Sequence, residues 1–117
     1  MRSYKRSDRV SELIHSEMVK ILRDIKELNH GLLTVTKVKL TDDLQTCRIF
    51  YSVIGTEQDR ENADKILNEN LKHIRFMLAN SVDLRRTPTI DFEYDSSAEE
   101  AVRVFELLDK IKREKKQ

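Results

Sequence analysis

Two strand-like segments joined by a short polar link constrain the fold most strongly. From Cys47 to Ile54 the side chains alternate, with Cys47, Ile49, Tyr51 and Val53 on one parity and Arg48, Phe50, Ser52 and Ile54 on the other. A segment rich in Val and Thr precedes them, from Leu33 to Leu40, and its parity changes midway. A bulge near Thr36-Lys37 reconciles the two halves. The turn cluster Thr41-Asp42-Asp43 between the segments therefore predicts an antiparallel hairpin.

A long amphipathic helix precedes this hairpin. Its apolar stripe recurs at three- and four-residue steps and comprises Val10, Leu13, Ile14, Met18, Ile21, Leu22, Ile25 and Leu28. Ser7 or Asp8 is the expected cap at its start. The segment Asn29-His30-Gly31 is the expected stop, because Gly31 can adopt the left-handed conformation that ends helices.

A second helical segment follows Gly55-Thr56 and loses its helical pattern by Val82. Its inner stripe comprises Ala63, Ile66, Leu67, Leu71, Ile74, Met77 and Leu78. Pro88 disfavours helix just before it, and the alternation from Thr89 to Tyr94 predicts a third strand. Ser97 and Glu100 match a capping box for a last helix. The inner stripe expected for that helix comprises Ala101, Val104, Phe105, Leu108 and Ile111.

These elements predict an α+β fold of two layers. The order is helix, strand, strand, helix, helix, strand and a final helix, with the helices on one face of a three-stranded mixed sheet. The chain has 117 residues, which predicts one domain, assigned to residues 1–111. Only charged and polar residues follow Ile111, so residues 112–117 are expected to form a basic, frayed tail.

Composition argues against several classes of protein. No apolar run approaches the roughly 18 residues of a membrane span, and the start of the chain lacks the apolar core of a secretory signal. A single cysteine, Cys47, suits a reducing cytoplasm. The only glycines are Gly31 and Gly55, so no nucleotide-binding loop or nucleophile elbow is present. We therefore expect no enzyme, no membrane partner and no small-molecule substrate.

Histidines and carboxylates give little support for a metal site or a cofactor. The three histidines fall in different elements without metal-ligand spacing. On the third strand Asp91, Glu93 and Asp95 share one face, which resembles a divalent-cation site. Cross-strand ion pairs are the favoured interpretation, with cations at outward parity on the hairpin, namely Lys37, Lys39 and Arg48. Such an acidic face repels a polyanion, so nucleic acid is expected to bind elsewhere.

Positive charge gathers at three places although the formal net charge is only +1. The N-terminal turn carries Lys5, Arg6 and Arg9, and the C-terminal tail is lysine-rich, which by itself also serves solubility. The third place is the segment from Lys72 and Arg75 to the pair Arg85-Arg86. Adjacent arginines on a short connection can each engage a phosphate, or can form salt bridges to neighbours such as Asp83 or Glu93.

Phe76 lies beside Lys72 and Arg75 at helical spacing. An exposed ring there can stack on an unpaired base. Packing beneath the first or last helix is the favoured alternative, because aromatic rings on helices more often belong to the core.

The order and spacing of several segments resemble the ribosome-binding factor A (RbfA) family. They are Arg9-Val10, LTVTKVKLTDDL at Leu33–Leu44, CRIFYSVIG at Cys47–Gly55, Ile74-Arg75, and LRRTPTIDFEYD at Leu84–Asp95. The resemblance implies a type II KH-like fold that lacks the GxxG loop. It implies a helix kink at Asn70-Leu71-Lys72, where relatives have Ala-x-Gly and this chain departs from the pattern. Because lysine adopts positive φ less readily than glycine, the kink is expected to move to Asn70 or to be milder.

The resemblance also implies a non-enzymatic ribosome-assembly factor, acting as a monomer in the cytoplasm. Its implied partners are the 30S ribosomal subunit and 16S rRNA, and its implied roles are late rRNA processing, subunit maturation and cold adaptation. The residues assigned to RNA binding are Lys5, Arg6, Arg9, Lys72, Arg75, Phe76, Arg85 and Arg86. A protein-interaction adaptor with a vestigial KH-like fold and no direct RNA binding is the alternative, because net charge is low and the GxxG loop is missing.

Overall fold

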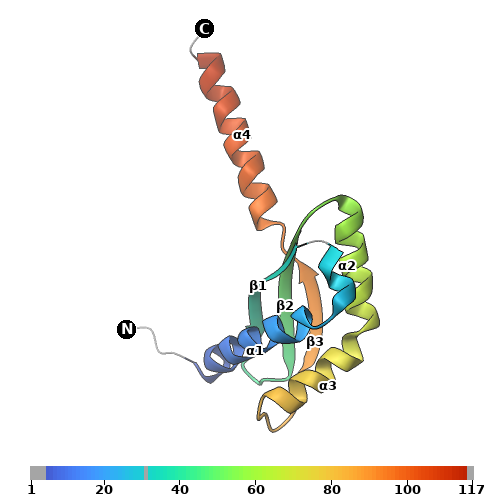
Figure 1. Cartoon of the computed structure of the whole chain (residues 1–117). Coiled ribbons are helices and arrows are strands. Elements are labelled where there is room, and N and C mark those ends of the chain that lie inside the picture. Colours follow the sequence, from blue (N-terminus) through green and yellow to red (C-terminus); the bar gives the residue numbers. More distant parts are fainter. Residues whose placement is uncertain (1–4, 31, 116–117) are drawn as a thin grey trace.

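The computed structural model describes residues 5–30 and 32–115 (Figure 1). The predicted order of elements is confirmed. The elements are α1 (Arg6–Arg23), a short 3-10 helix η1 (Lys26–His30), β1 (Leu32–Leu40), β2 (Thr46–Ile54), α2 (Glu57–Glu69), α3 (Leu71–Ser81), β3 (Thr89–Tyr94) and α4 (Ser97–Lys115). The sheet order is β1-β2-β3. β1 and β2 pair antiparallel, and β2 and β3 pair parallel through the α2–α3 crossover, so the mixed sheet is also confirmed.

The parity change in β1 is a β-bulge, as predicted. Val35 pairs with Tyr51, and Lys37 pairs with Phe50, the next residue back along β2, so Thr36 is the extra residue. The bulge lets both halves of β1 direct their apolar side chains toward the helices. On β1, the carbonyl of Val35 lies 3.1 Å from Nε2 of His15, which ties α1 to this edge strand.

The core lies between the inner sheet face and the helices. Ile14 and Met18 of α1, Ile49 and Tyr51 of β2, and the α2–α3 crossover supply its fully buried side chains. Each large side chain buried there contributes roughly 1.5–3 kcal/mol. The outward residues of the hairpin leave the opposite sheet face open to solvent.

The first helix begins earlier and ends earlier than predicted. Lys5, not Ser7 or Asp8, is the N-cap, and its backbone N–H donates to Asp8 Oδ2 at 3.2 Å. The α-helix stops at Arg23 because hydrogen bonds of the tighter three-residue type follow, such as Ile25 N–H to Leu22 O at 3.2 Å. Ile25 is nevertheless buried, as the apolar pattern requires. Gly31, the predicted stop, lies outside the described residues.

α4 contradicts the prediction that its apolar stripe packs in the core. None of its residues is buried, and Phe105 is 70% exposed. Figure 1 shows the helix projecting from the sheet. The radius of gyration is 17.7 Å, against about 13 Å for a compact chain of this length. The helix extends to Lys115, past Ile111, where the sequence predicted the start of a frayed tail.

Candidate nucleic-acid interface

The exposed face of α3 carries the first group of predicted RNA-binding residues. Lys72, Arg75 and Phe76 lie within one helical turn of each other and are all exposed. Phe76 is 63% exposed, so the favoured expectation that it packs beneath a helix is wrong. Ile74 and Leu78 hold this helix in place, because both are fully buried on its opposite face. α3 therefore presents an aromatic ring beside two cations.

The two helices of the crossover meet at Asn70, within the segment 70–72 where a kink was expected. Asn70 has φ −100° and ψ 9°, so no left-handed residue is needed there. Its side-chain amide donates to Ile66 O at 2.8 Å, competing with helical bonding at that carbonyl. The bonds Asn70 N–H to Ile66 O (3.0 Å) and Ile74 N–H to Asn70 O (2.8 Å) still bridge the break. The break is therefore mild, and it places Lys72 in the first turn of α3.

Arg75 fastens the loop between α3 and β3. Its Nε donates to Pro88 O at 3.2 Å and its Nη2 donates to Thr87 O at 3.0 Å. These bonds occupy one edge of the planar guanidinium and leave the Nη1 group without a described partner. The prediction treated Arg75 only as a phosphate contact, whereas the structure gives it a positioning role as well.

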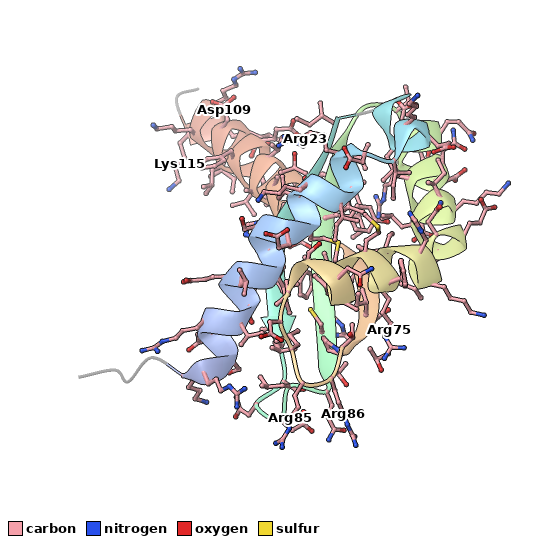
Figure 2. All side chains as sticks on the ribbon, turned by 60° about the horizontal axis from the view of Figure 1, so that its bottom comes forward. Arg23, Arg75, Arg85, Arg86, Asp109 and Lys115 are labelled. Atoms are coloured by element: carbon pink, nitrogen blue, oxygen red, sulfur yellow. The ribbon has the colours of Figure 1, made fainter. Side chains whose placement is uncertain are left out.

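Arg85 and Arg86 project from this loop into solvent (Figure 2). Neither forms an ion pair with any residue that the structure describes. The proposed salt bridge to Glu93 is absent, because Glu93 lies 3.8 Å from Arg48 instead. Val82 and Pro88 anchor the two ends of the loop in the core. Arg85 and Arg86 therefore lie on a loop whose two ends are held in the core.

Arg75, Arg85 and Arg86 lie at one end of the molecule in Figure 2. Lys72 precedes Arg75 by one turn of α3. We call these four cations the basic ridge. It has charge, an adjacent exposed ring and a fixed backbone, which are the elements needed to bind phosphates and an unpaired base.

The N-terminal cations are arranged differently. Lys5 Nζ lies 3.5 Å from Asp42 Oδ2, and Arg9 is also engaged within the fold. Arg6 is exposed and has no partner among residues 5–30 and 32–115. The turn that holds Asp42 reaches β3 on its other side, where Thr89 N–H donates to Gln45 O at 2.9 Å. An acidic turn therefore lies between the N-terminal cations and the loop of the basic ridge.

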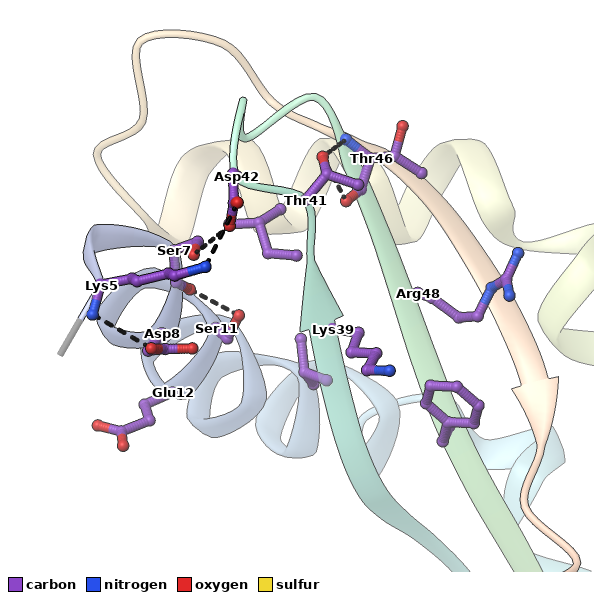
Figure 3. Close-up of a pocket in the computed structure, with 13 residues that line it drawn as sticks. Lys5, Ser7, Asp8, Ser11, Glu12, Lys39, Thr41, Asp42, Thr46 and Arg48 are labelled. Carbon is purple, nitrogen blue, oxygen red and sulfur yellow. Dashed lines mark hydrogen bonds and ion pairs between the residues drawn. The ribbon is translucent and has the colours of Figure 1, made fainter. Parts of the chain in front are cut away.

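A groove of about 1260 Å³ runs between the start of α1 and β1 (Figure 3). Its charged lining residues are Lys5, Asp8, Glu12, Lys39, Asp42 and Arg48. Three cations and three carboxylates balance each other, so this groove has no net attraction for a polyanion. The groove therefore does not coincide with the basic ridge, which is the best candidate for phosphate binding.

The open sheet face is balanced in charge rather than acidic. Arg48 Nε lies 3.4 Å from Asp91 Oδ2, and Lys37 and Lys39 add two further cations. Cross-strand pairing was therefore the correct interpretation for Arg48, and the expected strong repulsion of a polyanion was overstated. No group of three or more potential metal ligands occurs in the described part of the chain.

Buried ionisable groups are held in their neutral forms. Burial raises the pKa of the Cys47 thiol to about 11. Burial, together with the charge and hydrogen bond of Asp64, raises the pKa of Tyr51 to about 12. A thiol with this pKa is a poor nucleophile at neutral pH. Neither group is poised for catalysis.

Sequence reasoning missed a cluster at the root of α4. Tyr94 Oη donates to Glu99 Oε1 at 2.5 Å, and Arg60 Nη1 lies 3.9 Å from Glu99 Oε2. The Arg60 guanidinium also stacks over the Tyr94 ring, 3.6 Å from its centroid. The three residues come from α2, β3 and α4, and no local sequence pattern joins them.

Comparisons with known proteins agree with the fold. A profile described as ribosome-binding factor A matches residues 6–108. A protein of that name from Trichlorobacter lovleyi is 39% identical over 109 residues, covering 92% of this chain and 89% of the relative. A solution structure of a putative ribosome binding factor A from Thermotoga maritima aligns with TM-score 0.69 and 23% identity, covering 83% of this chain and 93% of the other.

Ribosome-binding factor A from Thermus thermophilus, as fitted into a cryo-EM map of a 30S complex, aligns with TM-score 0.57 and 22% identity. The alignment covers 78% of this chain and 92% of that one. At this identity the likeness supports the fold only. Among the described residues, no helix is long and apolar enough to cross a membrane. The profile match and the close relative together show that this chain belongs to the ribosome-binding factor A family.

Proposed function

We propose that this chain binds the 30S ribosomal subunit through 16S rRNA and assists late rRNA processing and subunit maturation without catalysing a reaction. Family membership supports a ribosomal role. The 30S complex described for the Thermus thermophilus relative supports the choice of subunit. Cytoplasmic location and a role in cold adaptation belong to the same proposal.

One observation carries the RNA-binding part of the proposal. The basic ridge presents Arg85 and Arg86, which have no ion-pair partner among the described residues, on a loop that Arg75 and two buried residues hold in place. Arginine matches the geometry of phosphate and can bind it bidentately. A double-stranded RNA is recognised mainly by shape and backbone, so a ridge without a base-reading motif suffices. Phe76 adds a platform for a base that has left its helix.

Residues 1–111 act in this proposal as one KH-like RNA-binding domain. The ridge is its principal RNA contact, and the N-terminal cations form a second, weaker one. Arg6 contributes most among the latter, because Lys5 is already paired with Asp42.

Salt-dependent binding to purified 30S subunits tests the proposal. We expect affinity to fall steeply with salt, and we expect Arg85→Gln/Arg86→Gln to reduce the salt slope by about 2, since each lost phosphate contact removes about 1. A matched control removes the same charge elsewhere, with Arg23→Gln/Lys26→Gln on exposed residues of α1 and η1. Arg23 lies at the opposite side of the molecule from Arg85 and Arg86 in Figure 2. Affinity that is insensitive to salt, or equal loss in both variants, refutes the proposed interface.

The adaptor alternative gives a different outcome in the same experiment. A protein-only contact survives in the Arg85→Gln/Arg86→Gln variant and persists after nuclease treatment of the subunits. Direct RNA binding is abolished by nuclease.

A further inference from the structure

β1 is an edge strand whose outer side opens into the groove of Figure 3. Among the described strands, the order β1-β2-β3 leaves one side of β1 without a neighbour. Val38, Lys39 and Leu40 line the groove, and Val38 and Leu40 are only half-buried. The groove volume of about 1260 Å³ exceeds that of a pocket for a drug-sized molecule, roughly 300–1,000 Å³. It is therefore large enough to hold an extended segment of polypeptide beside the strand.

The backbone of β1 directs hydrogen-bonding groups toward this groove. Thr41 N–H donates to Thr46 O at 3.0 Å, so Thr41 bonds toward β2. Bonding groups alternate in an antiparallel ladder, so the N–H and C=O groups of Val38 and Leu40 point away from β2. These groups have no partner in the part of the chain that the structure describes. A strand edge of this kind can pair with the backbone of an added strand.

Contacts from the first helix limit the open edge at both ends. At one end, His15 Nε2 lies 3.1 Å from the carbonyl oxygen of Val35 and covers the edge there. At the other end, Lys5 Nζ lies 3.5 Å from Asp42 Oδ2. The edge between these contacts comprises residues 36–41 and is about 20 Å long, at roughly 3.3 Å per residue. Its length suits an added strand of about six residues.

The side chains beside the edge indicate the chemistry of that strand. Lys37 and Lys39 extend onto the open sheet face, and neither forms an ion pair with a described residue. On the opposite face the groove is lined by half-buried Val38 and Leu40, and by Glu12 of α1. Successive side chains of a strand point to opposite faces. The complementary strand therefore alternates acidic residues, beside the two lysines, with apolar residues, beside Val38 and Leu40.

We propose that the edge of β1 binds an alternating acidic and apolar segment of a partner protein by antiparallel strand addition. The antiparallel arrangement is chosen because it is slightly more stable per residue. A second copy of the same edge is disfavoured, since it brings lysines opposite lysines. A polyanion is disfavoured because the charges that line the groove balance. The basic ridge lies on α3 and the following loop, so this contact is separate from the proposed RNA contact.

Amide hydrogen exchange of the full chain, followed by NMR, tests the strand addition. The probe is a hexapeptide that alternates valine and glutamate, with both ends capped. Exchange at the Val38 and Leu40 N–H groups is expected to slow about ten-fold when the free peptide concentration is about ten times its Kd. The Lys39 N–H, which points toward β2, is expected to change little.

Two N-methylated versions of the hexapeptide test whether backbone pairing causes this protection. In an antiparallel pair the valine N–H groups face β1 and the glutamate N–H groups point away from it. Methylation of the valine amides is expected to abolish protection at Val38 and Leu40. Methylation of the glutamate amides is the matched control and is expected to preserve it. Equal loss with both methylated peptides, or no protection by the parent peptide, overturns the proposal.

A charge reversal tests the preference for acidic residues. Lys39→Glu is expected to weaken binding of the valine–glutamate peptide roughly two- to five-fold, because a cross-strand ion pair contributes up to about 1 kcal/mol. The same variant is expected to strengthen binding of a valine–lysine peptide. Lys26→Glu is the control, since Lys26 is exposed and does not line the groove. Equal effects of the two substitutions overturn the proposal, as does protection of Val38 and Leu40 by hexauridylate but not by the peptide.

Discussion

Arg75→Lys separates the positioning role of Arg75 from direct phosphate contact. The substitution keeps the positive charge on α3. It removes the planar fork that donates to Pro88 O and Thr87 O at 3.2 and 3.0 Å, because a lysine ammonium has a different shape and reach. The loop carrying Arg85 and Arg86 then loses its fastening to α3.

The expected loss of stability is modest. A net hydrogen bond contributes about 0.5–1.5 kcal/mol, and Arg75 is exposed, so water replaces part of what is lost. We expect the free energy of unfolding to fall by about 1–2 kcal/mol, measured by urea unfolding at constant m-value. Amide hydrogen exchange is expected to accelerate at Thr89, whose N–H donates to Gln45 O at the end of the same loop.

Binding to 30S subunits gives the decisive comparison. Arg75→Lys is expected to lower affinity while the salt slope stays close to that of the parent chain, because the number of charges facing phosphate is unchanged. Arg85→Gln is expected to lower both the affinity and the salt slope, with little change in unfolding free energy. If Arg75→Lys leaves the loop amides and the unfolding free energy unchanged, the positioning role is refuted. If Arg75→Lys lowers affinity without accelerating exchange at the loop amides or lowering the unfolding free energy, Arg75 is chiefly a phosphate contact.

Three further predictions concern single side chains. Phe76→Ala should change the unfolding free energy by less than about 0.5 kcal/mol but should weaken rRNA binding by about 1–3 kcal/mol if the ring stacks on a base; urea unfolding and filter binding measure the two, and unchanged binding excludes stacking. Burial raises the pKa of Cys47 to about 11, so the thiol should resist alkylation at pH 8 in the native chain and react readily in urea; fast native alkylation contradicts this. The contribution of Cys47 to stability should be present below its ordinary pKa of 9.0 and should be lost as pH rises through 11. Hydrogen bonds from Ser97 and Thr36 lower the pKa of Asp95 to about 2. The difference in unfolding free energy between the parent chain and Asp95→Asn should therefore be constant above pH 3.8, the ordinary pKa of an aspartate, and should shrink as pH falls toward 2. A difference that does not change between about pH 4 and pH 2 refutes this prediction.

The hairpin, the crossover and the bulge were predictable because each rests on local patterns. Alternation fixes which side chains face the helices, and a change of parity at Thr36-Lys37 permits few solutions besides an extra residue. The break at Asn70 could be anticipated for a similar reason, since an asparagine side chain competes with the backbone for hydrogen bonds to nearby carbonyl groups.

The placement of α4 was not predictable from its pattern. An apolar stripe at helical spacing predicts that one face of a helix is covered, but it does not indicate which part of the molecule covers that face. Glu99, in the first turn of α4, accepts a hydrogen bond from Tyr94 and forms an ion pair with Arg60. These contacts hold the start of α4, and the ion pair joins residues far apart in the chain. Phe76 was misjudged for the same reason, because burial is decided by neighbouring elements rather than by the helix that carries the ring.

A net charge of only +1 is compatible with binding a polyanion when carboxylates are neutralised locally. Arg48 lies between Asp91 and Glu93 on the open sheet face, and Lys5 lies against Asp42. The four cations of the basic ridge form no ion pairs with described residues, and Asp83 of the same loop offsets only one of them. The net charge sums all the ionised groups of the chain. A phosphate interacts mainly with the charges that lie within a Debye length of about 8–10 Å. The sequence places Arg85 and Arg86 beside each other, and the fold gives neither of them an ion-pair partner within residues 5–30 and 32–115.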